Sequence, residues 1–315
     1  MHARKPHSAE RRDVMLAEIQ DLRTAVVGLG TMGRGIARML SAAGATVSAF
    51  DPAVRTAVDL RQDGISGPEV GASLEACVAD ADIVFEAVFE DLDVKERVLR
   101  AISATSPGAV IASNTSTFRP TTLASFVDRP ERLLVAHFFN PADLIPLVEI
   151  VPHAATDGAI AADVVDLMRK LGKRPVLLQA ETSGFVANRL QAAMLRESLA
   201  LIEAGVIDAA GIDAVVMSAL APRWTVAGPI GVADQGGLDI FAAVCAEIFP
   251  TLDNAEVPPD VLLNLVAAGR LGEKGGSGFY EHTAESAQAA RQRLVAMLAI
   301  TEGWRRGDQT TRAPA

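Results

Sequence analysis

The sequence predicts an α/β fold in two parts, a doubly wound parallel sheet followed by an all-α domain. Three observations predict it. Apolar, β-branched segments alternate with helical ones up to residue 182, a glycine-rich turn follows the first of them, and no strong strand pattern occurs after residue 184. We expect an N-terminal extension at 1–22, a sheet domain at 23–182 and a helical domain at 183–315.

Short apolar segments mark the expected strands. The first, TAVVG at 24–28, is apolar on both faces, as in a buried parallel strand. The others lie at 46–50, 82–88, 108–114, 132–138, 145–151 and 174–179. Helices are expected at 32–44, 93–103 and 157–172, with Gly44 and Gly172 as stops, and, in the helical domain, at 184–205 and 284–306.

Composition excludes several classes of function. The net charge of −10 argues against binding nucleic acid or an anionic membrane through bulk charge. The two cysteines, Cys77 and Cys245, form no metal-ligand spacing, so we expect no metal site, and a reducing, cytoplasmic location fits. No apolar run reaches the ~18–20 residues that span a bilayer. The N-terminus is charged and lacks the apolar core of a secretory signal, so we expect an extension that ends in a short helix.

The glycine-rich turn at 28–33 reads GLGTMG and joins a strand to a helix. Gly28 permits a tight turn, Gly30 lets the backbone approach a pyrophosphate, and Gly33 lets the helix pack closely on the strand. The helix N-terminus favours the phosphate charge. The turn therefore predicts a dinucleotide site in a Rossmann domain.

Asp51 ends the second expected strand, about 20 residues past the glycines. A carboxylate there accepts hydrogen bonds from the adenosine ribose and repels a 2′-phosphate, so we expect NAD as the cofactor rather than NADP. Arg55 is close enough to weaken that preference.

His137 and Glu149 bracket the mostly apolar segment HFFNPADLIPLVE. A histidine suits the removal of a hydroxyl proton, and a carboxylate on its other ring nitrogen would fix the tautomer. Asn140-Pro141 breaks the strand, and a hairpin-like return centred on Asp143 would bring the two side chains together. From the spacing alone, a core histidine at a strand end is the favoured interpretation.

Seven segments follow one another along the chain in the order in which a known family carries them: GLGTMGRGIA, FEAVFEDLDVKERVL, ASNTSTF, HFFNP…LVE, TSGFVANRL, GVADQGGLD and GEKGGSGFY. Together, from residue 23 to about residue 281, they resemble the 3-hydroxyacyl-CoA dehydrogenase family. The resemblance implies an NAD-dependent Rossmann domain joined to an all-α domain, similar to the C-terminal domain of 6-phosphogluconate dehydrogenase, through which the chain forms a homodimer. It implies that a small-molecule (S)-3-hydroxyacyl-CoA and its 3-ketoacyl-CoA are interconverted, in fatty acid metabolism. Other members act on free acids such as gulonate and carnitine.

The family's functional residues transfer motif by motif. The resemblance implies His137 as the catalytic base, Glu149 as its partner, and Ser116 and Asn188 as hydrogen-bond donors to the substrate. It implies cofactor contacts from Gly28, Gly30, Thr31, Met32, Gly33, Asp51, Glu90, Lys95, Asn114, Ser116, Asn140 and Lys274.

The chain departs from the family between Asp51 and Glu86. Typical acyl-CoA members carry a helical insertion there whose serine and lysine help to clasp CoA, whereas this segment is shorter and has no lysine, and Arg55 and Arg61 are its basic residues. The phosphates of CoA need cationic or N–H partners. A smaller departure is Ser183, which replaces a proline.

Three functions therefore remain open. The first is a dehydrogenase of 3-hydroxyacyl-CoA, and the second is a dehydrogenase or ketoreductase of a free or carrier-bound 3-hydroxy acid. The third is a non-catalytic NAD-binding structural protein. The intact set of Ser116, His137, Glu149 and Asn188 argues against the third.

Overall fold

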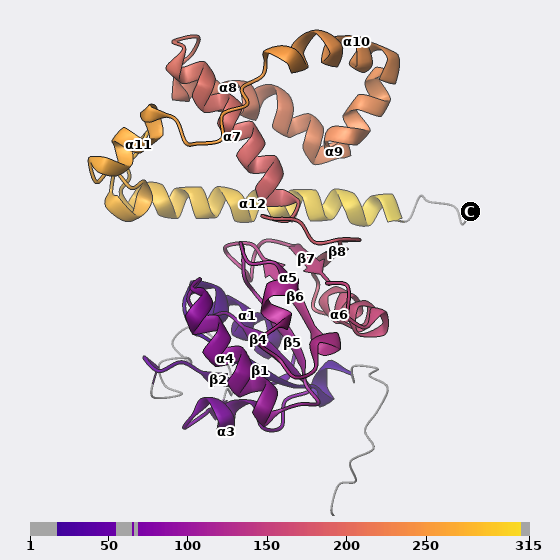
Figure 1. Cartoon of the computed structure of the whole chain (residues 1–315). Coiled ribbons are helices and arrows are strands. Elements are labelled where there is room, and N and C mark those ends of the chain that lie inside the picture. Colours follow the sequence, from indigo (N-terminus) through magenta and orange to yellow (C-terminus); the bar gives the residue numbers. More distant parts are fainter. Residues whose placement is uncertain (1–17, 55–64, 66–68, 310–315) are drawn as a thin grey trace, which may run out of the picture. The chain divides into compact units, whose positions relative to one another are not determined.

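The computed structural model describes residues 18–54, 65 and 69–309 (Figure 1). The chain divides into two compact units, Met1–Ala187 and Asn188–Ala315, whereas the sequence pattern placed the boundary after residue 182. The expected helix of the N-terminal extension falls largely on residues 1–17, outside the described residues. The part described there holds a short 3₁₀ turn, η1 (Ile19–Asp21).

The first unit is built on one sheet with the strand order β3-β2-β1-β4-β5-β6-β7-β8. The six strands β3 to β6 follow the 3-2-1-4-5-6 order of a dinucleotide-binding sheet and run parallel. At β7 the chain reverses, because β6 and β7 pair antiparallel, and β8 pairs parallel with β7. The strands are β1 (Arg23–Val27), β2 (Thr46–Phe50), β3 (Glu69–Val70), β4 (Ile83–Glu86), β5 (Val110–Ser113), β6 (Leu133–Phe138), β7 (Leu147–Val151) and β8 (Arg174–Leu177).

Helices cover both faces of this sheet, as the doubly wound fold class requires (Figure 1). Apolar residues of α1 (Thr31–Ala42) and α6 (Gly158–Lys170) share one buried cluster with one face of the strands. Those of α3 (Leu74–Val78), α4 (Leu92–Thr105) and α5 (Pro120–Ala124) share a second cluster with the other face. Neighbouring strand residues divide between the clusters: Val26 joins the first, and Ala25 and Val27 join the second.

The sequence-based elements of this unit are confirmed, with their ends shifted by a few residues. Gly44 and Gly172 follow α1 and α6 with φ of 90° and 75°, the left-handed conformation of a helix stop. The short elements β3, α3 and α5 were not expected from the pattern, since each is too brief to show a period.

The regular elements in the described part of the second unit are helices, apart from isolated bridges at Gly272, Ser277 and Glu281. The expected segments 184–205 and 284–306 form α7 (Ala187–Glu203) and α12 (Ala284–Gln309). Between them lie α8 (Ala209–Val215), the π-helical turn η3 (Val216–Leu220), α9 (Ala221–Gly236), α10 (Leu238–Ile248), η4 (Phe249–Thr251), α11 (Asp260–Ala267) and η5 (Glu273–Gly275). In the described part of the chain, no helix combines the length and the hydropathy that a membrane span requires.

Two phenylalanines close together in sequence give a test of the core. Phe85 on β4 is fully buried and packs edge-to-face on Phe138, whereas Phe89 is 80% exposed. We expect Phe85→Ala to lower the free energy of unfolding by about 3–5 kcal/mol and Phe89→Ala to change it by no more than about 0.5 kcal/mol. Denaturant unfolding followed by circular dichroism measures both. Equal losses would contradict the assigned core.

Candidate functional site

The glycine turn has the predicted geometry. It leads from β1 into α1, and Gly28 has φ of 93°. A Cβ on Gly33 would collide with the carbonyl oxygen of Gly28, so this position demands glycine. A Cβ on Gly30 would meet nothing within 4 Å, which leaves the space above the helix N-terminus open to a ligand.

Asp51 follows β2 directly and is held by the backbone. Its carboxylate accepts hydrogen bonds from the N–H of Leu29, at 2.8 Å, and of Ala53, at 2.8 Å. The first of these bonds joins the acid to the glycine turn, so its position is tied to that of the phosphate site. The spare lone pairs of the carboxylate can accept the hydroxyls of a ribose.

A cavity of about 610 Å³ runs along the carboxyl ends of four neighbouring strands, β2, β1, β4 and β5. This is the edge at which open α/β sheets bind ligands. Of the predicted cofactor residues, eight line it: Gly28, Gly30, Thr31, Met32, Asp51, Glu90, Asn114 and Ser116. With Asp51 at one end and the glycine turn in the middle, the cavity has the arrangement expected for a dinucleotide, with adenosine predicted at β2 and nicotinamide at β5.

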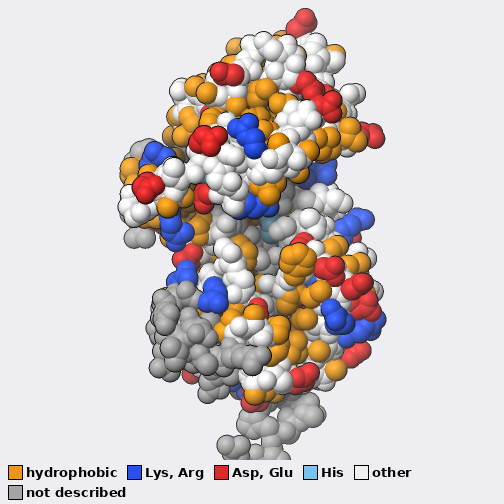
Figure 2. All heavy atoms as spheres, turned by 90° about the vertical axis from the view of Figure 1, so that its left-hand side faces the viewer, with side chains coloured by type: hydrophobic (Ala, Val, Ile, Leu, Met, Phe, Trp, Pro, Cys, Tyr) orange, Lys and Arg blue, Asp and Glu red, His pale blue; other side chains and the backbone are white. Residues whose placement is uncertain are grey.

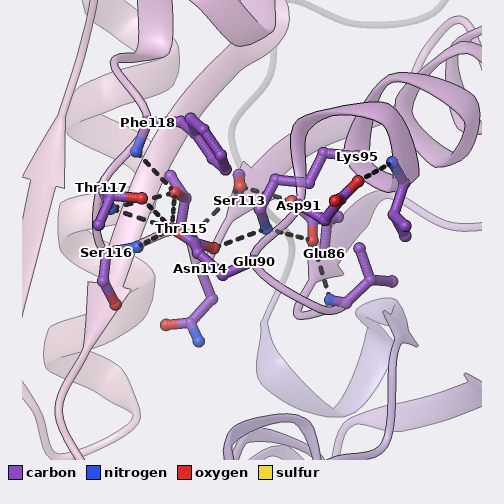
Figure 3. Close-up of polar contacts among 12 residues, drawn as sticks. Glu86, Glu90, Asp91, Lys95, Ser113, Asn114, Thr115, Ser116, Thr117 and Phe118 are labelled. Atoms are coloured by element: carbon purple, nitrogen blue, oxygen red, sulfur yellow. Dashed lines mark hydrogen bonds and ion pairs between the residues drawn. The ribbon is translucent and has the colours of Figure 1, made fainter. Parts of the chain in front are cut away.

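A buried ion pair holds the loops at the β4–β5 end of the cavity (Figure 3). Glu86, the last residue of β4, receives Lys95 Nζ at 2.9 Å, and both side chains are fully buried. Glu86 also accepts the hydroxyl of Ser113, at 2.5 Å, and the N–H of Val88, at 2.9 Å. Lys95 was expected to contact the cofactor. Its buried ammonium reaches Glu86 and Glu90, and its contact with the cofactor stays a prediction.

Glu90 connects this ion pair to the turn after β5. One of its oxygens accepts the hydroxyls of Thr115 and Thr117 and the N–H groups of Ser116 and Thr117, at 2.5–3.0 Å. Burial raises the pKa of Glu90, but the two hydroxyls, Lys95 and the Ser116 N–H outweigh it and hold the pKa below its ordinary value. The side chains of Asn114 and Ser116 point away from this cluster (Figure 3), and both residues line the cavity.

His137 and Glu149 face each other across the antiparallel strands β6 and β7. They are direct partners in the strand register, and His137 Nδ1 lies 3.0 Å from Glu149 Oε2. Both residues are buried, with 3% and 2% exposed. The return expected around Asp143 is confirmed, since the connection between the strands lies between Phe138 and Leu147.

The second oxygen of Glu149 also accepts hydrogen bonds. Oε1 accepts the N–H of Val186 at 3.0 Å and the N–H of Ala187 at 2.9 Å. Burial raises the pKa of Glu149, but the bond to His137 and the two backbone donors outweigh it, so the pKa lies below its ordinary value. Because an ionised carboxylate only accepts, the neutral tautomer of His137 that fits this contact carries its proton on Nδ1 and its free lone pair on Nε2.

Two aromatic rings contact the imidazole of His137. The ring centroid of Phe139 lies 4.4 Å away and that of Phe185 lies 5.3 Å away, both tilted by 55°. Asn114 brings this centre next to the cavity, because it lines the cavity and its Oδ1 accepts the N–H of Phe138 at 3.0 Å.

The β6–β7 connection is fixed by charged groups that the sequence analysis did not single out. Lys173 Nζ donates to the carbonyl oxygens of Ala142 and Ile145, at 2.6 and 2.9 Å. Arg38 forms an ion pair with Asp143 at 2.7 Å. The sequence analysis also did not identify four further residues of the site, Glu86, Ser113, Phe139 and Phe185. Of these, Glu86 could have been found, because a charged residue at the end of an otherwise apolar strand is unusual.

Besides Lys95, His137 and Glu149, four predicted residues are not among those that line the cavity. Gly33 serves helix packing, and Asn140 is exposed in the β6–β7 connection. Asn188, the second residue of α7, and Lys274, in η5, belong to the second unit, and their ligand contacts stay predictions. Arg55 and Arg61, the basic residues of the shortened segment, lie outside the described residues.

Family comparison agrees with this architecture. The model of the 3-hydroxyacyl-CoA dehydrogenase NAD-binding domain matches residues 63–182, and that of the family's C-terminal domain matches 184–282. The NAD-binding domain of D-isomer specific 2-hydroxyacid dehydrogenases matches residues 2–101, which include the glycine turn.

Three curated relatives illustrate the range of similarity. A 5-formyl-3-hydroxy-2-methylpyridine 4-carboxylate 5-dehydrogenase of Mesorhizobium japonicum is 32% identical over 89% of this chain and 98% of its own. A 3-hydroxybutyryl-CoA dehydrogenase of Mycobacterium tuberculosis is 32% identical over 82% and 98%. An L-carnitine dehydrogenase of Streptomyces griseus is 38% identical over 66% and 68%.

Solved structures agree as well. The crystal structure of a 5-formyl-3-hydroxy-2-methylpyridine 4-carboxylic acid 5-dehydrogenase, described as an NAD⁺-dependent dismutase, superimposes with a TM-score of 0.83 at 32% identity, over 89% of this chain and 98% of that one. A 3-hydroxyacyl-CoA dehydrogenase of Archaeoglobus fulgidus does so with 0.66 at 33%, over 89% and 99%. The chain is therefore an NAD-dependent oxidoreductase that belongs to the 3-hydroxyacyl-CoA dehydrogenase family.

Proposed function

We propose that the protein interconverts a 3-hydroxyacyl and a 3-ketoacyl substrate, with His137 as the catalytic base and Glu149 as its partner. The observation that carries this is the buried contact of 3.0 Å between His137 Nδ1 and Glu149 Oε2. The strand order supports it, because β6, which bears His137, lies next to β5, at the nicotinamide end of the cavity.

In the proposed mechanism, the base exchanges a proton with the substrate through Nε2. In the oxidation direction, Nε2 of His137 takes the proton of the substrate hydroxyl while the hydride leaves the same carbon, and NAD supplies the acceptor for that hydride. The imidazolium that forms is stabilised by the Glu149 carboxylate on Nδ1. In the reverse direction, the Nε2–H donates to the ketone oxygen.

Two further residues complete the proposed site. Ser116 lines the β5 end of the cavity and would donate its hydroxyl to the reacting oxygen. Asn188 directly follows Ala187, whose N–H is bonded to Glu149, and would hold the substrate carbonyl through its amide. The contact of Lys274 with the cofactor belongs to the same proposal.

A coenzyme A thioester is the first candidate substrate, as the family's C-terminal domain match supports. A free hydroxy acid is the second, and specific observations favour it. The segment from 52 to 85 contains no lysine, and the relative with matched length and a TM-score of 0.83 is named for a pyridine carboxylate. The hydride chemistry is the same for both.

We also propose that the second unit pairs with a second copy of this chain. Among its described residues, Leu199 is the one buried apolar side chain, while Met217, Val226 and Ile230 are more than half exposed. Orange side chains accordingly lie open over the helical unit, at the top of Figure 2. Exposed apolar area of this extent is typical of a protein interface.

Replacing the base tests the mechanism directly. We expect His137→Ala to lower kcat by about 10²–10⁴-fold, the contribution of a general base. NADH should bind as before, because His137 is not among the residues that line the cofactor cavity. Steady-state kinetics and NADH fluorescence titration measure the two effects. Turnover close to that of the wild type would rule the mechanism out.

We expect Glu149→Gln to lower kcat as strongly as His137→Ala does, because it would change the tautomer of His137. The N–H groups of Val186 and Ala187 select the amide oxygen at the Oε1 position, so the NH₂ group faces Nδ1. Nδ1 must then accept and Nε2 carries the proton, so it no longer serves as a base in oxidation. We expect kcat to fall by about 10⁴-fold, as for an equivalent change in a triad. Glu96→Gln, on exposed α4 surface, is the matched control and should leave kcat unchanged.

Substrate class is settled by a screen in the reductive direction. NADH oxidation is followed with acetoacetyl-CoA, with a short thioester analogue that lacks the nucleotide, and with free 3-keto acids. If the thioester is the substrate, kcat/KM should be highest for acetoacetyl-CoA. Equal values for the full thioester and the analogue would show that the nucleotide is not bound, and activity with free acids alone would establish the second candidate.

Sedimentation measures the proposed pairing. We expect twice the chain mass of 33.0 kDa. Val226→Asp and Ile230→Asp, at strongly exposed positions of α9, should shift the protein towards monomer, whereas Asp93→Lys on the first unit should not. A monomeric wild type at micromolar concentration would contradict the proposal.

A further inference from the structure

Residues 184–187, Gly-Phe-Val-Ala, form a tight turn beside the His137–Glu149 pair. Gly184 has φ of 72° and Phe185 has φ of 52°, and the Phe185 N–H donates to the carbonyl oxygen of Thr182 at 3.1 Å. Phe185 is the non-glycine residue with positive φ in the described part of the chain. A bulky residue in this conformation is strained and persists only where its surroundings fix it.

The backbone of the turn serves Glu149. Two left-handed residues in succession aim the next two N–H groups, of Val186 and Ala187, at a single oxygen, Oε1. Consecutive amides arranged in this way form a nest for an anionic group. Because Oε1 accepts both amides, Oε2 remains to accept a hydrogen bond from His137. The turn therefore determines which carboxylate oxygen contacts the imidazole and how the carboxylate is oriented towards it.

The side chain of the turn serves His137. Phe185 is fully buried and its ring contacts the imidazole at 5.3 Å between centroids. If only the backbone nest were needed, glycine or asparagine would adopt this φ with less strain. The phenylalanine ring packs in the second apolar cluster and against the imidazole, and glycine or asparagine could supply neither contact.

We infer that the 184–187 turn positions the proposed base, with Phe185 as a positioning residue that holds the imidazole plane and Gly184 as the residue that aims the amides at Glu149. This inference rests on the proposed function of His137. It concerns the chemical step and not cofactor binding, because none of the four residues lines the cofactor cavity.

Two substitutions separate the roles. Phe185→Leu removes the ring and keeps an apolar side chain, and Gly184→Ala disturbs the left-handed backbone and leaves the ring in place. Phe85→Leu is the control for the first, since Phe85 is also fully buried but is not in contact with His137. Gly172→Ala is the control for the second, at a similar φ of 75° with open space around it.

Kinetics give the first readout. Both turn variants should lower kcat by about tenfold or more, a part of the 10²–10⁴ that a general base supplies, with the Kd of NADH unchanged. The control variants should lose thermal stability to a similar degree with kcat close to that of the wild type. If turn variants and controls have the same kcat, the inference is wrong.

The tautomer of His137 gives the second readout, and it does not depend on activity. In ¹⁵N spectra of histidine-labelled protein, His137 is identified among the five histidines by its loss in His137→Asn. We expect a protonated Nδ1 and a free Nε2 in the wild type and in both controls, and a mixture of tautomers in Gly184→Ala. An unchanged tautomer in Gly184→Ala would overturn the role of the nest.

Two outcomes distinguish the failure of the proposed function from the failure of this inference. An active His137→Ala variant would refute the proposed function itself. An inactive His137→Ala variant combined with fully active turn variants would leave that function standing and refute this inference alone.

Discussion

The site depends on the buried carboxylate of Glu149. A buried charge without partners costs several kcal/mol, so the fold must supply hydrogen bonds to it. The antiparallel pairing of β6 and β7 supplies one, from His137, and the turn before α7 supplies two more, from Val186 and Ala187. The same bonds that make the charge tolerable also orient the imidazole. The arrangement that stabilises the buried charge is therefore also the one on which the proposed chemistry relies.

A second buried carboxylate, Glu86, holds the loops that line the cofactor cavity in place through its hydrogen bonds. It ends β4, accepts Lys95 and Ser113, and through Lys95 fixes Glu90 against the turn that carries Asn114 and Ser116. The cavity wall and the His137–Glu149 pair meet at Asn114, whose side chain accepts the backbone N–H of Phe138, next to His137. The two buried acids thus brace the sheet edge where cofactor and substrate would meet.

Much of this could be predicted from the sequence, for definite reasons. Long apolar strands, the GLGTMG turn and the helix stops at Gly44 and Gly172 are local signals, and the Asn140-Pro141 break predicted the return that brings His137 to Glu149. The roles of Lys95, Lys173 and Phe185 could not be read in this way. Lys95 and Lys173 look like solvated lysines until tertiary packing buries them, and the positive φ of Phe185 has no sequence signature. The substrate class could not be predicted either, because the basic residues of the segment that departs from the family, Arg55 and Arg61, lie outside the described residues.

The central claim is that Nε2 of His137 is the atom that exchanges a proton with the substrate. A crystal structure of the protein with NADH and a 3-keto substrate tests it most directly. The account predicts the ketone oxygen within about 2.6–3.2 Å of Nε2, with the contact between Nδ1 and Glu149 kept at its present 3.0 Å. A ketone oxygen bound beyond the reach of Nε2, while another acid or base contacts it, would contradict the account.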